Sequence, residues 1–344
     1  MRAIQKNAAK PGAELVELDI PVIEKNEILV EVKATALCKS DIDVYEWTTL
    51  VQNGKYKLPF TMGHEFAGRV VEVGEDVKGI KVNDRVAGET HIPCGYCHTC
   101  RTGNQHICRN NMGVIGRSVN GSFAEYIKIP EIAAIKLPDN ITYRQGAVLE
   151  PFATALHSLS KVNFAGNSIA ITGIGAIGLM AVELAKFMGA TQIFAIGRNE
   201  KRLEECKSRG ADVLINSSRQ DFVKEIMKHT NGVGVSSIID MTGNEQIINQ
   251  SVEALMVAGS LVVVGMVDKP LTFNNYMYGA VYKELKITGI FGRRMFETWE
   301  MAMSILRTGR IDLNSYIGGI SKIEDIDKAV QDFKKVSGRI IFEF

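Results

Sequence analysis

The fold of this chain is decided by the stretch Ser168-Ile-Ala-Ile-Thr172-Gly173-Ile-Gly175-Ala176-Ile177-Gly178, an apolar run that ends in three spaced glycines. The run predicts a buried strand, and the apolar spacing over residues 176–188 predicts a helix. In such a strand–turn–helix unit the first glycine allows a tight turn, the second lets the backbone approach a pyrophosphate, and the third packs helix on strand. The helix N-terminus then faces the anion. The stretch therefore predicts a dinucleotide site formed by Gly173, Gly175, Ala176, Ile177 and Gly178.

The chain divides into two regions that differ in their sequence pattern, and the glycine-rich stretch lies in the second. Residues 1 to about 150 alternate β-branched residues with polar ones and are punctuated by glycine, which is typical of short strands. From residue 150 onward strands and helices alternate, which predicts a doubly wound parallel sheet. We therefore expect an α/β fold in which a Rossmann domain, residues 150–290, is inserted into a β-rich domain of residues 1–149 and 291–344.

The end of the next predicted strand, residues 192–196, bears on the choice of cofactor. An NAD site normally carries Asp or Glu there to bind the ribose 2′-hydroxyl, but this chain has Gly197. Glycine leaves room for a 2′-phosphate, and the planar guanidinium of Arg198 can pair with that phosphate. We expect NADP(H) rather than NAD(H), which stays possible if Arg198 and Arg202 only form a solvated helix start. Thr242, after the predicted strand 237–240, is a further candidate for cofactor contact.

Length and composition set limits on the function. The 344 residues suggest two domains, and the net charge of +1 gives no reason to expect a nucleic-acid or membrane partner. The longest apolar runs are too short and too rich in glycine to span a bilayer, and the N-terminus shows no secretory signal. The cysteines are clustered, which indicates metal ligands in a reducing compartment. We expect a cytoplasmic protein.

Four cysteines lie between residues 94 and 108 with the spacing C-x2-C-x2-C-x7-C. Four thiolates close a tetrahedral shell and leave no position for substrate, so this pattern predicts a structural zinc. An iron–sulfur cluster is the alternative, but the last spacing and the missing Cys-Pro disfavour it. The predicted ligands are Cys94, Cys97, Cys100 and Cys108.

A second, dispersed set of candidate ligands consists of Cys38, His64, Glu65 and Glu150. A catalytic zinc needs about three protein ligands and one open position. Each of these residues taken alone has an ordinary structural explanation, for example a lone cysteine as a buried apolar side chain. Together with a dinucleotide domain they predict a catalytic zinc, and hence two Zn²⁺ ions per chain.

Several motifs resemble those of the zinc-dependent medium-chain dehydrogenase/reductase family. They include Gly63-His-Glu65, the cysteine cluster, Glu150-Pro151 and the glycine loop, and the resemblance covers essentially the whole chain. Three stretches are most similar to the L-threonine 3-dehydrogenase branch: Tyr45-Glu-Trp47, Glu89-Thr-His-Ile92 and Gly289-Ile-Phe-Gly-Arg-Arg-Met-Phe-Glu-Thr-Trp299. Other stretches, such as residues 116–117 and 120–126, also occur in sorbitol- and galactitol-phosphate-type relatives.

The resemblance implies a GroES-like catalytic domain, a Rossmann domain and a homotetramer, with a dimer as the alternative. It implies that Cys38, His64 and Glu150 hold the catalytic zinc, with Glu65 or water in the fourth place. It further implies that Ser40 passes on the substrate proton and that Arg202 contacts the adenosine ribose.

The chain departs from the family pattern at three positions. Gly197 stands where the branch usually has an acidic residue, and Lys39 replaces a common glycine. Asp43 replaces the relay histidine; a carboxylate can relay a proton, but its ordinary pKa of about 4 is a poor match to neutral pH. These departures weaken the assignment of threonine as substrate more than that of the reaction.

We therefore expect an enzyme that transfers a hydride between a secondary alcohol and a nicotinamide cofactor. The expected substrate is a threonine-like amino alcohol, and a polyol or sugar phosphate is the alternative. Two other classes compete with this reading, namely a catalytically silent nucleotide-binding or redox-sensing protein and a zinc-free quinone or enoyl reductase. A metal count of two per chain separates these from the zinc enzyme.

Overall fold

The computed structural model describes residues 1–54, 56–110, 112–267 and 269–344. The chain forms two compact units, Met1–Ala153 with Arg293–Phe344, and Thr154–Gly292. These limits describe compactness in space, and the domain limits expected from the sequence stay a prediction. None of the helices in the described ranges has the length and apolar character needed to cross a membrane.

The unit Thr154–Gly292 contains a six-stranded, fully parallel sheet of order β13-β12-β11-β14-β15-β16. This order is that of a Rossmann fold, with the switch point between β11 and β14. The strands are β11 (Ser168–Thr172), β12 (Gln192–Gly197), β13 (Val213–Asn216), β14 (Val235–Asp240), β15 (Leu255–Val263) and β16 (Lys286–Gly289).

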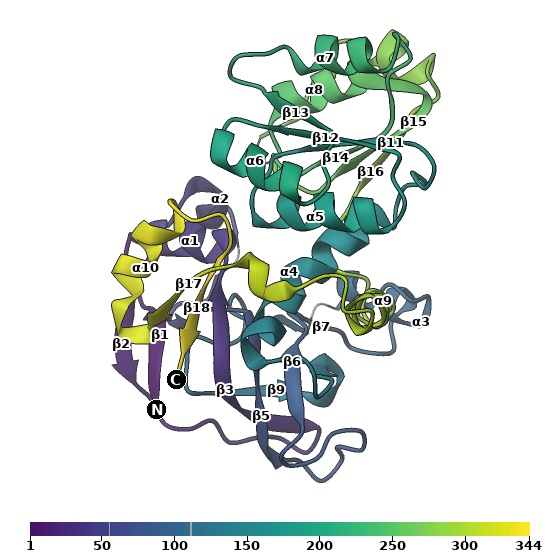
Figure 1. Cartoon of the computed structure of the whole chain (residues 1–344). Helices are drawn as coiled ribbons and strands as arrows, with labels where there is room; N and C mark the ends of the chain where they lie inside the picture. Colours follow the sequence, from purple (N-terminus) through teal and green to yellow (C-terminus); the bar gives the residue numbers. More distant parts are fainter. Residues whose placement is uncertain (55, 111, 268) are drawn as a thin grey trace. The chain divides into compact units, whose positions relative to one another are not determined.

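Helices cover both faces of this sheet. In Figure 1, α5 and α6 lie on one face and α7 and α8 on the other. They span α5 (Ala176–Phe187), α6 (Glu200–Ser208), α7 (Phe222–His229) and α8 (Glu245–Ala254). Because both faces are covered, the inner strands read as continuous apolar runs; every residue of β14, for example, is buried. The predicted strand–helix alternation and the Rossmann fold are thus confirmed.

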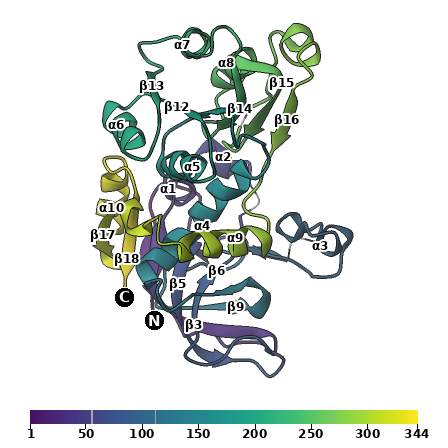
Figure 2. The same ribbon diagram turned by 45° about the vertical axis from the view of Figure 1, so that its right-hand side comes forward.

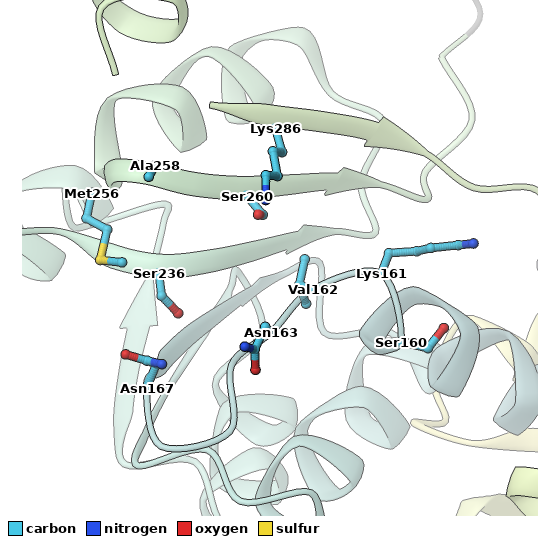
Figure 3. Close-up of a pocket in the computed structure, with 10 residues that line it drawn as sticks. All are labelled: Ser160, Lys161, Val162, Asn163, Asn167, Ser236, Met256, Ala258, Ser260 and Lys286. Atoms are coloured by element: carbon cyan, nitrogen blue, oxygen red, sulfur yellow. The ribbon is translucent and has the colours of Figure 1, made fainter. Parts of the chain in front are cut away.

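A hollow of about 410 Å³ lies at the amino ends of these strands (Figure 3). Val235 pairs with Leu255 but Ser237 pairs with Ser260, so β15 carries extra residues and bulges away from β14. Ser236, Met256 and Ser260 line the hollow, and Figure 3 shows the Lys161 side chain directed away from the other residues there. The hollow is distinct from the glycine loop, which follows the carboxyl end of β11.

The other unit is built on a seven-stranded sheet of order β10-β6-β5-β3-β18-β17, with β9 also paired to β3. Its strands are β3 (Glu27–Leu37), β5 (Glu65–Val73), β6 (Arg85–Gly88), β9 (Tyr126–Pro130), β10 (Ala134–Lys136), β17 (Ile317–Lys322) and β18 (Arg339–Glu343). Two smaller sheets combine β1 (Arg2–Lys6), β2 (Glu14–Glu17) and β4 (Phe60–Thr61), and β7 (His91–Ile92) with β8 (Gly113–Val114).

The α-helices that belong wholly or partly to the described residues of this unit are α1 (Lys39–Glu46), α2 (Thr49–Gln52), α3 (His98–Arg101), α4 (Tyr143–Leu159), α9 (Glu297–Arg307) and α10 (Ile326–Phe333). The last part of the chain completes the sheet, because β18 pairs antiparallel with β3. Arg294 donates a hydrogen bond to the carbonyl of Gly103 at 3.0 Å, so the segment before α9 lies beside the lobe that carries α3 (Figure 2). Residues near both chain ends therefore contribute to one site, described next.

Candidate active site

The register of β3 and β5 brings three of the predicted ligands together. Glu65 opens β5 and lies opposite Ala36 of β3, and Cys38 follows directly after β3. The ligand atoms of Cys38, His64 and Glu65 all lie within 4.8 Å of one another. A thiolate, an imidazole and a carboxylate form a donor set that zinc accepts, so these residues fit the ion.

Asp41 positions two of these side chains. Its Oδ2 accepts a hydrogen bond from the backbone N–H of Cys38 at 2.9 Å, and its Oδ1 lies 3.3 Å from Nδ1 of His64. Burial alone lowers the pKa of His64, but the facing Asp41 outweighs it and holds that pKa well above its ordinary value. A carboxylate behind a metal-ligating histidine fixes the ring orientation and makes the ligand more basic.

The carboxylate of Glu65 is held by a buried arginine. Nε and Nη2 of Arg339 donate to its two oxygens at 2.7 Å each, and Nη2 lies 3.7 Å from Sγ of Cys38. Such a two-armed pair is stronger than a single hydrogen bond. Any binding of a metal by Glu65 therefore competes with this pair.

Glu150, the third ligand expected from the resemblance, lies on α4 and is engaged elsewhere. Its Oε1 accepts hydrogen bonds from Oγ1 of Thr90 at 2.9 Å and from Nη1 of Arg293. Within the described part of the chain, Glu150 is not among the side chains whose ligand atoms converge with Cys38 and His64. Its role as a ligand stays a prediction.

The two predicted proton-transfer residues lie on the first turns of α1. Oγ of Ser40 is 3.5 Å from Nε2 of His64, so the hydroxyl faces the candidate metal site. Asp43 forms an ion pair with Lys39 one helical turn away, and the Lys39 side chain is largely exposed. Lys39 and Asp43, which both depart from the family pattern, are thus partners in one ion pair.

The cysteine lobe forms a compact sulfur cluster. All four Sγ atoms lie within 4.8 Å of one another, and three of the pairs are separated by 3.5, 3.8 and 3.9 Å. A tetrahedron with zinc–sulfur bonds of 2.3 Å has sulfur atoms about 3.8 Å apart, so the spacing fits this ion. A hydrogen bond with Thr99 lowers the pKa of the Cys97 thiol to about 5, which favours the thiolate. His91 does not join this cluster and contacts Glu89 instead.

The glycine loop has the shape that a pyrophosphate requires. Gly173 has a φ of +84°, and a Cβ there would lie 2.7 Å from the Thr242 side chain. A Cβ at Gly178 would lie 2.3 Å from the carbonyl oxygen of Gly173, so helix and turn need both glycines. In contrast, a Cβ at Gly175 meets no described atom within 4 Å, which leaves space at the start of α5. The buried carboxylate of Asp240 fixes Thr242 by accepting its hydroxyl hydrogen bond at 2.6 Å.

Gly197 and its neighbours show a packing constraint that the sequence did not indicate. A Cβ at Gly197 would lie 2.3 Å from Cγ1 of Ile174, so any side chain at position 197 would displace Ile174, which belongs to the glycine loop. Arg198 is exposed, and the backbone N–H of Arg202 donates to the Asn199 cap of α6 at 3.1 Å. The nearest following acid, Glu200, accepts from Asn216 at 2.5 Å and pairs with Arg219.

The sequence matches two family models, described as the alcohol dehydrogenase GroES-like domain over residues 24–139 and the zinc-binding dehydrogenase over residues 176–308. The L-threonine 3-dehydrogenase of Caldanaerobacter subterraneus is 40% identical over 90% of this chain and 88% of that protein. The L-threonine 3-dehydrogenase of Pyrococcus horikoshii is 36% identical over 99% and 98%. The chain belongs to the zinc-dependent medium-chain dehydrogenase/reductase family. It is an alcohol dehydrogenase-type oxidoreductase (EC 1.1.1) with a GroES-like and a Rossmann-type domain.

Solved structures of this family are similar over the whole chain. Galactitol-1-phosphate dehydrogenase from Escherichia coli has a TM-score of 0.90 at 26% identity and covers 100% of both chains. A putative zinc-binding dehydrogenase from Sinorhizobium meliloti bound to NADP has a TM-score of 0.90 at 26% identity, covering 100% and 99%. The family is therefore one with zinc and a nicotinamide cofactor.

Sequence reasoning missed the residues that hold the candidate ligands of this dehydrogenase. Asp41 had a local signal, because an acid three residues after Cys38 at a helix start is a typical capping position. Arg293 lies in the stretch 289–299 that carries the resemblance, but no local pattern indicates its contact with Glu150, and Arg339 had no signal at all, since each contacts a partner more than 100 residues away. Such contacts depend on strand register and chain return rather than on local pattern.

Proposed function

We propose that this enzyme catalyses the reversible oxidation of the secondary alcohol of L-threonine or a similar amino alcohol to a ketone, with NADP(H). The observation that carries the proposal is the convergence of Cys38, His64 and Glu65 beside the hydroxyl of Ser40. The relatives named L-threonine 3-dehydrogenase, which match nearly the full chain, support the substrate class.

The proposed site has two metal ions per chain. Cys94, Cys97, Cys100 and Cys108 hold the structural zinc, and Cys38, His64 and either Glu150 or Glu65 hold the catalytic one. When bound, the catalytic zinc supplies Lewis-acid stabilisation of the alcohol oxygen. Ser40 accepts the hydroxyl proton and passes it toward Asp43, which forms an ion pair with Lys39. Asp41 keeps Nδ1 of His64 occupied, so Nε2 would be the atom that His64 offers to the metal.

The glycine loop, with Thr242 beside it, would hold the coenzyme, whose nicotinamide ring would supply the acceptor for a hydride from the substrate carbon. Gly197 and Arg198 favour NADP(H), because a carboxylate is missing where an NAD site has one. The pairing of Glu200 with Arg219 supports this choice, since that acid already has partners. The NADP-bound relative from Sinorhizobium meliloti supports it further.

A polyol or sugar phosphate is the second candidate substrate. The structural neighbours galactitol-1-phosphate dehydrogenase and 2R,3R-butanediol dehydrogenase favour it, the latter with 28% identity and a TM-score of 0.88. The test is a panel of L-threonine, polyols and polyol phosphates, each measured with NADP⁺ and NAD⁺ on protein of known zinc content. Threonine with NADP⁺ should give the highest kcat/KM. A clear preference for a polyol phosphate overturns the substrate class, and a clear preference for NAD⁺ overturns the cofactor.

We also propose that the enzyme is a cytoplasmic homotetramer, with a dimer as the alternative. The clustered thiols suit a reducing compartment. Strand β16 stands at the edge of its sheet, and the exposed residues Tyr276, Tyr278 and Tyr282 precede it. An uncovered strand edge beside exposed aromatic side chains is typical of an interface between subunits. Sedimentation equilibrium measures the state directly.

A further inference from the structure

The loop of residues 114–122 lies directly against the segment that carries His64. A Cβ at Gly116 would lie 2.5 Å from the carbonyl oxygen of Gly63, the residue before His64. The same oxygen accepts a hydrogen bond from the backbone N–H of Ser122 at 3.0 Å. Glycine at position 116 permits this close approach of two backbone segments. The loop is therefore fixed one residue away from a candidate metal ligand.

Arg117 follows the glycine of this contact and is half-buried. Its backbone N–H donates a hydrogen bond to the carbonyl of Val114 at 3.1 Å, so the residue belongs to the turn of the loop. Burial raises the pKa of the Tyr56 phenol, and the strongest charge that acts on this phenol is the positive charge of Arg117, which lowers that pKa. The charges of Asp41 and His64 act on the same phenol. The guanidinium and the candidate metal site thus lie within electrostatic reach of one tyrosine.

Arg117 differs from the other cations near the candidate ligands, because those cations have acidic partners. The pairs are Arg339 with Glu65, Lys39 with Asp43, and Arg293 with Glu89 and Glu150. Among the residues that the structure describes, none forms an ion pair with Arg117. Taking a guanidinium partly out of water without a counter-charge is unfavourable. An anionic ligand at the site would supply that counter-charge.

We propose that Arg117 binds the carboxylate of the amino-alcohol substrate and so determines the preference for a charged alcohol over an uncharged one. In L-threonine the carboxylate carbon is two bonds away from the hydroxyl carbon, so an alcohol oxygen at the metal site leaves the carboxylate for a neighbouring group. The planar guanidinium can hold both carboxylate oxygens at once. The inference rests on the proposed function and names the side chain that recognises the charge of the substrate.

The test compares L-threonine with 1-amino-2-propanol, which has a hydrogen in place of the carboxylate, on the zinc-loaded enzyme at saturating coenzyme. In Arg117→Gln, kcat/KM for L-threonine should fall about 10- to 100-fold, mainly through KM, as expected for the loss of a hydrogen bond to a charged group. The same parameter for 1-amino-2-propanol should stay unchanged, because this alcohol offers the guanidinium no carboxylate. If its turnover is too slow to follow, its inhibition constant against L-threonine replaces kcat/KM.

Two further variants separate recognition from structure and from general charge effects. Arg117→Lys keeps the charge but loses the planar fork, so the loss on L-threonine should be smaller. This variant also takes the place of Arg117→Gln if that one does not fold. Arg69→Gln removes a positive charge that pairs with Glu31 in the same unit, and it should leave both alcohols as in the wild type.

The outcomes distinguish the role of Arg117 from the proposed function. Equal losses for both alcohols in Arg117→Gln, or no loss for either, overturn the role of Arg117 alone, because the wild type still oxidises L-threonine. A wild-type enzyme that oxidises polyol phosphates and not L-threonine overturns the proposed substrate, and the carboxylate contact with it.

Discussion

The carboxylate of Asp41 lies between the two candidate ligands His64 and Cys38, with its Oδ1 3.3 Å from Nδ1 of His64 and its Oδ2 2.9 Å from the backbone nitrogen of Cys38. The buried Asp41 side chain thus orients the imidazole of His64, which directly precedes β5. It also fixes the backbone at Cys38, which directly follows β3.

Asp41→Asn should weaken zinc binding at the catalytic site by about 10- to 100-fold, because the ring loses its charged partner. Competition with a chromogenic chelator measures the affinity, and the structural zinc serves as an internal reference. Asp43→Asn, on the same helix, should leave the zinc affinity unchanged. Equal affinities for Asp41→Asn and wild type would show that Asp41 does not orient the ligand.

Zinc binding at the catalytic site should depend on pH through His64. Asp41 raises the pKa of His64 in the metal-free protein despite burial, and zinc binds only the neutral ring. The affinity should therefore rise with pH until the pH passes the raised pKa, and protons should be released on binding. Calorimetric titration in buffers of different ionisation enthalpy counts them. An affinity that falls with rising pH contradicts this assignment.

The glycine loop allows a matched pair of substitutions. Gly175→Ala places a methyl group where the described structure has open space, so the thermal midpoint should stay unchanged while NADPH binds at least tenfold more weakly. Gly178→Ala meets the carbonyl of Gly173 and should also destabilise the protein by about 1–3 kcal/mol. Fluorescence titration and thermal unfolding separate the two effects. Full coenzyme affinity in Gly175→Ala would place the pyrophosphate elsewhere.

Cofactor choice should change only when the packing at Gly197 is relieved. Gly197→Asp alone forces its Cβ against Ile174 and should lower stability. Gly197→Asp with Ile174→Ala makes room for the carboxylate, which repels a 2′-phosphate and accepts the ribose hydroxyl, so kcat/KM should shift toward NAD⁺ by about tenfold or more. The ratio of kcat/KM for the two cofactors is the readout. If the double variant keeps the wild-type ratio, Gly197 does not select the cofactor.

The cysteine lobe should be separable from catalysis. Cys100→Ser removes one of the four thiolates of the proposed structural zinc site, which ties together residues 94–108. The metal content should therefore fall from two ions per chain toward one, and the thermal midpoint of unfolding should drop. Metal analysis together with the visible spectrum of the Co²⁺-substituted enzyme tells which site is emptied. Loss of the ion at Cys38 and His64 instead would mean that the two sites are not independent.

The sequence by itself determined those parts of this protein whose residues are neighbours in the chain. The glycine loop lies within residues 173–178 and the cysteine lobe within 94–108, so turn geometry and ligand spacing can be read from neighbouring residues. The alternation of strands and helices predicted the Rossmann sheet, because each apolar run signals its own burial.

Only the tertiary structure decided what holds the dispersed ligands. Arg339 reaches Glu65 because β18 pairs with β3, and Arg293 reaches Glu89 and Glu150 because the chain returns to the first unit after Gly292. The sequence indicated only a role of Gly197 in cofactor choice. The structure shows a packing role as well, because a Cβ at position 197 would collide with Ile174. Contacts between residues that lie so far apart in the chain follow from strand register and packing, and no local pattern encodes them.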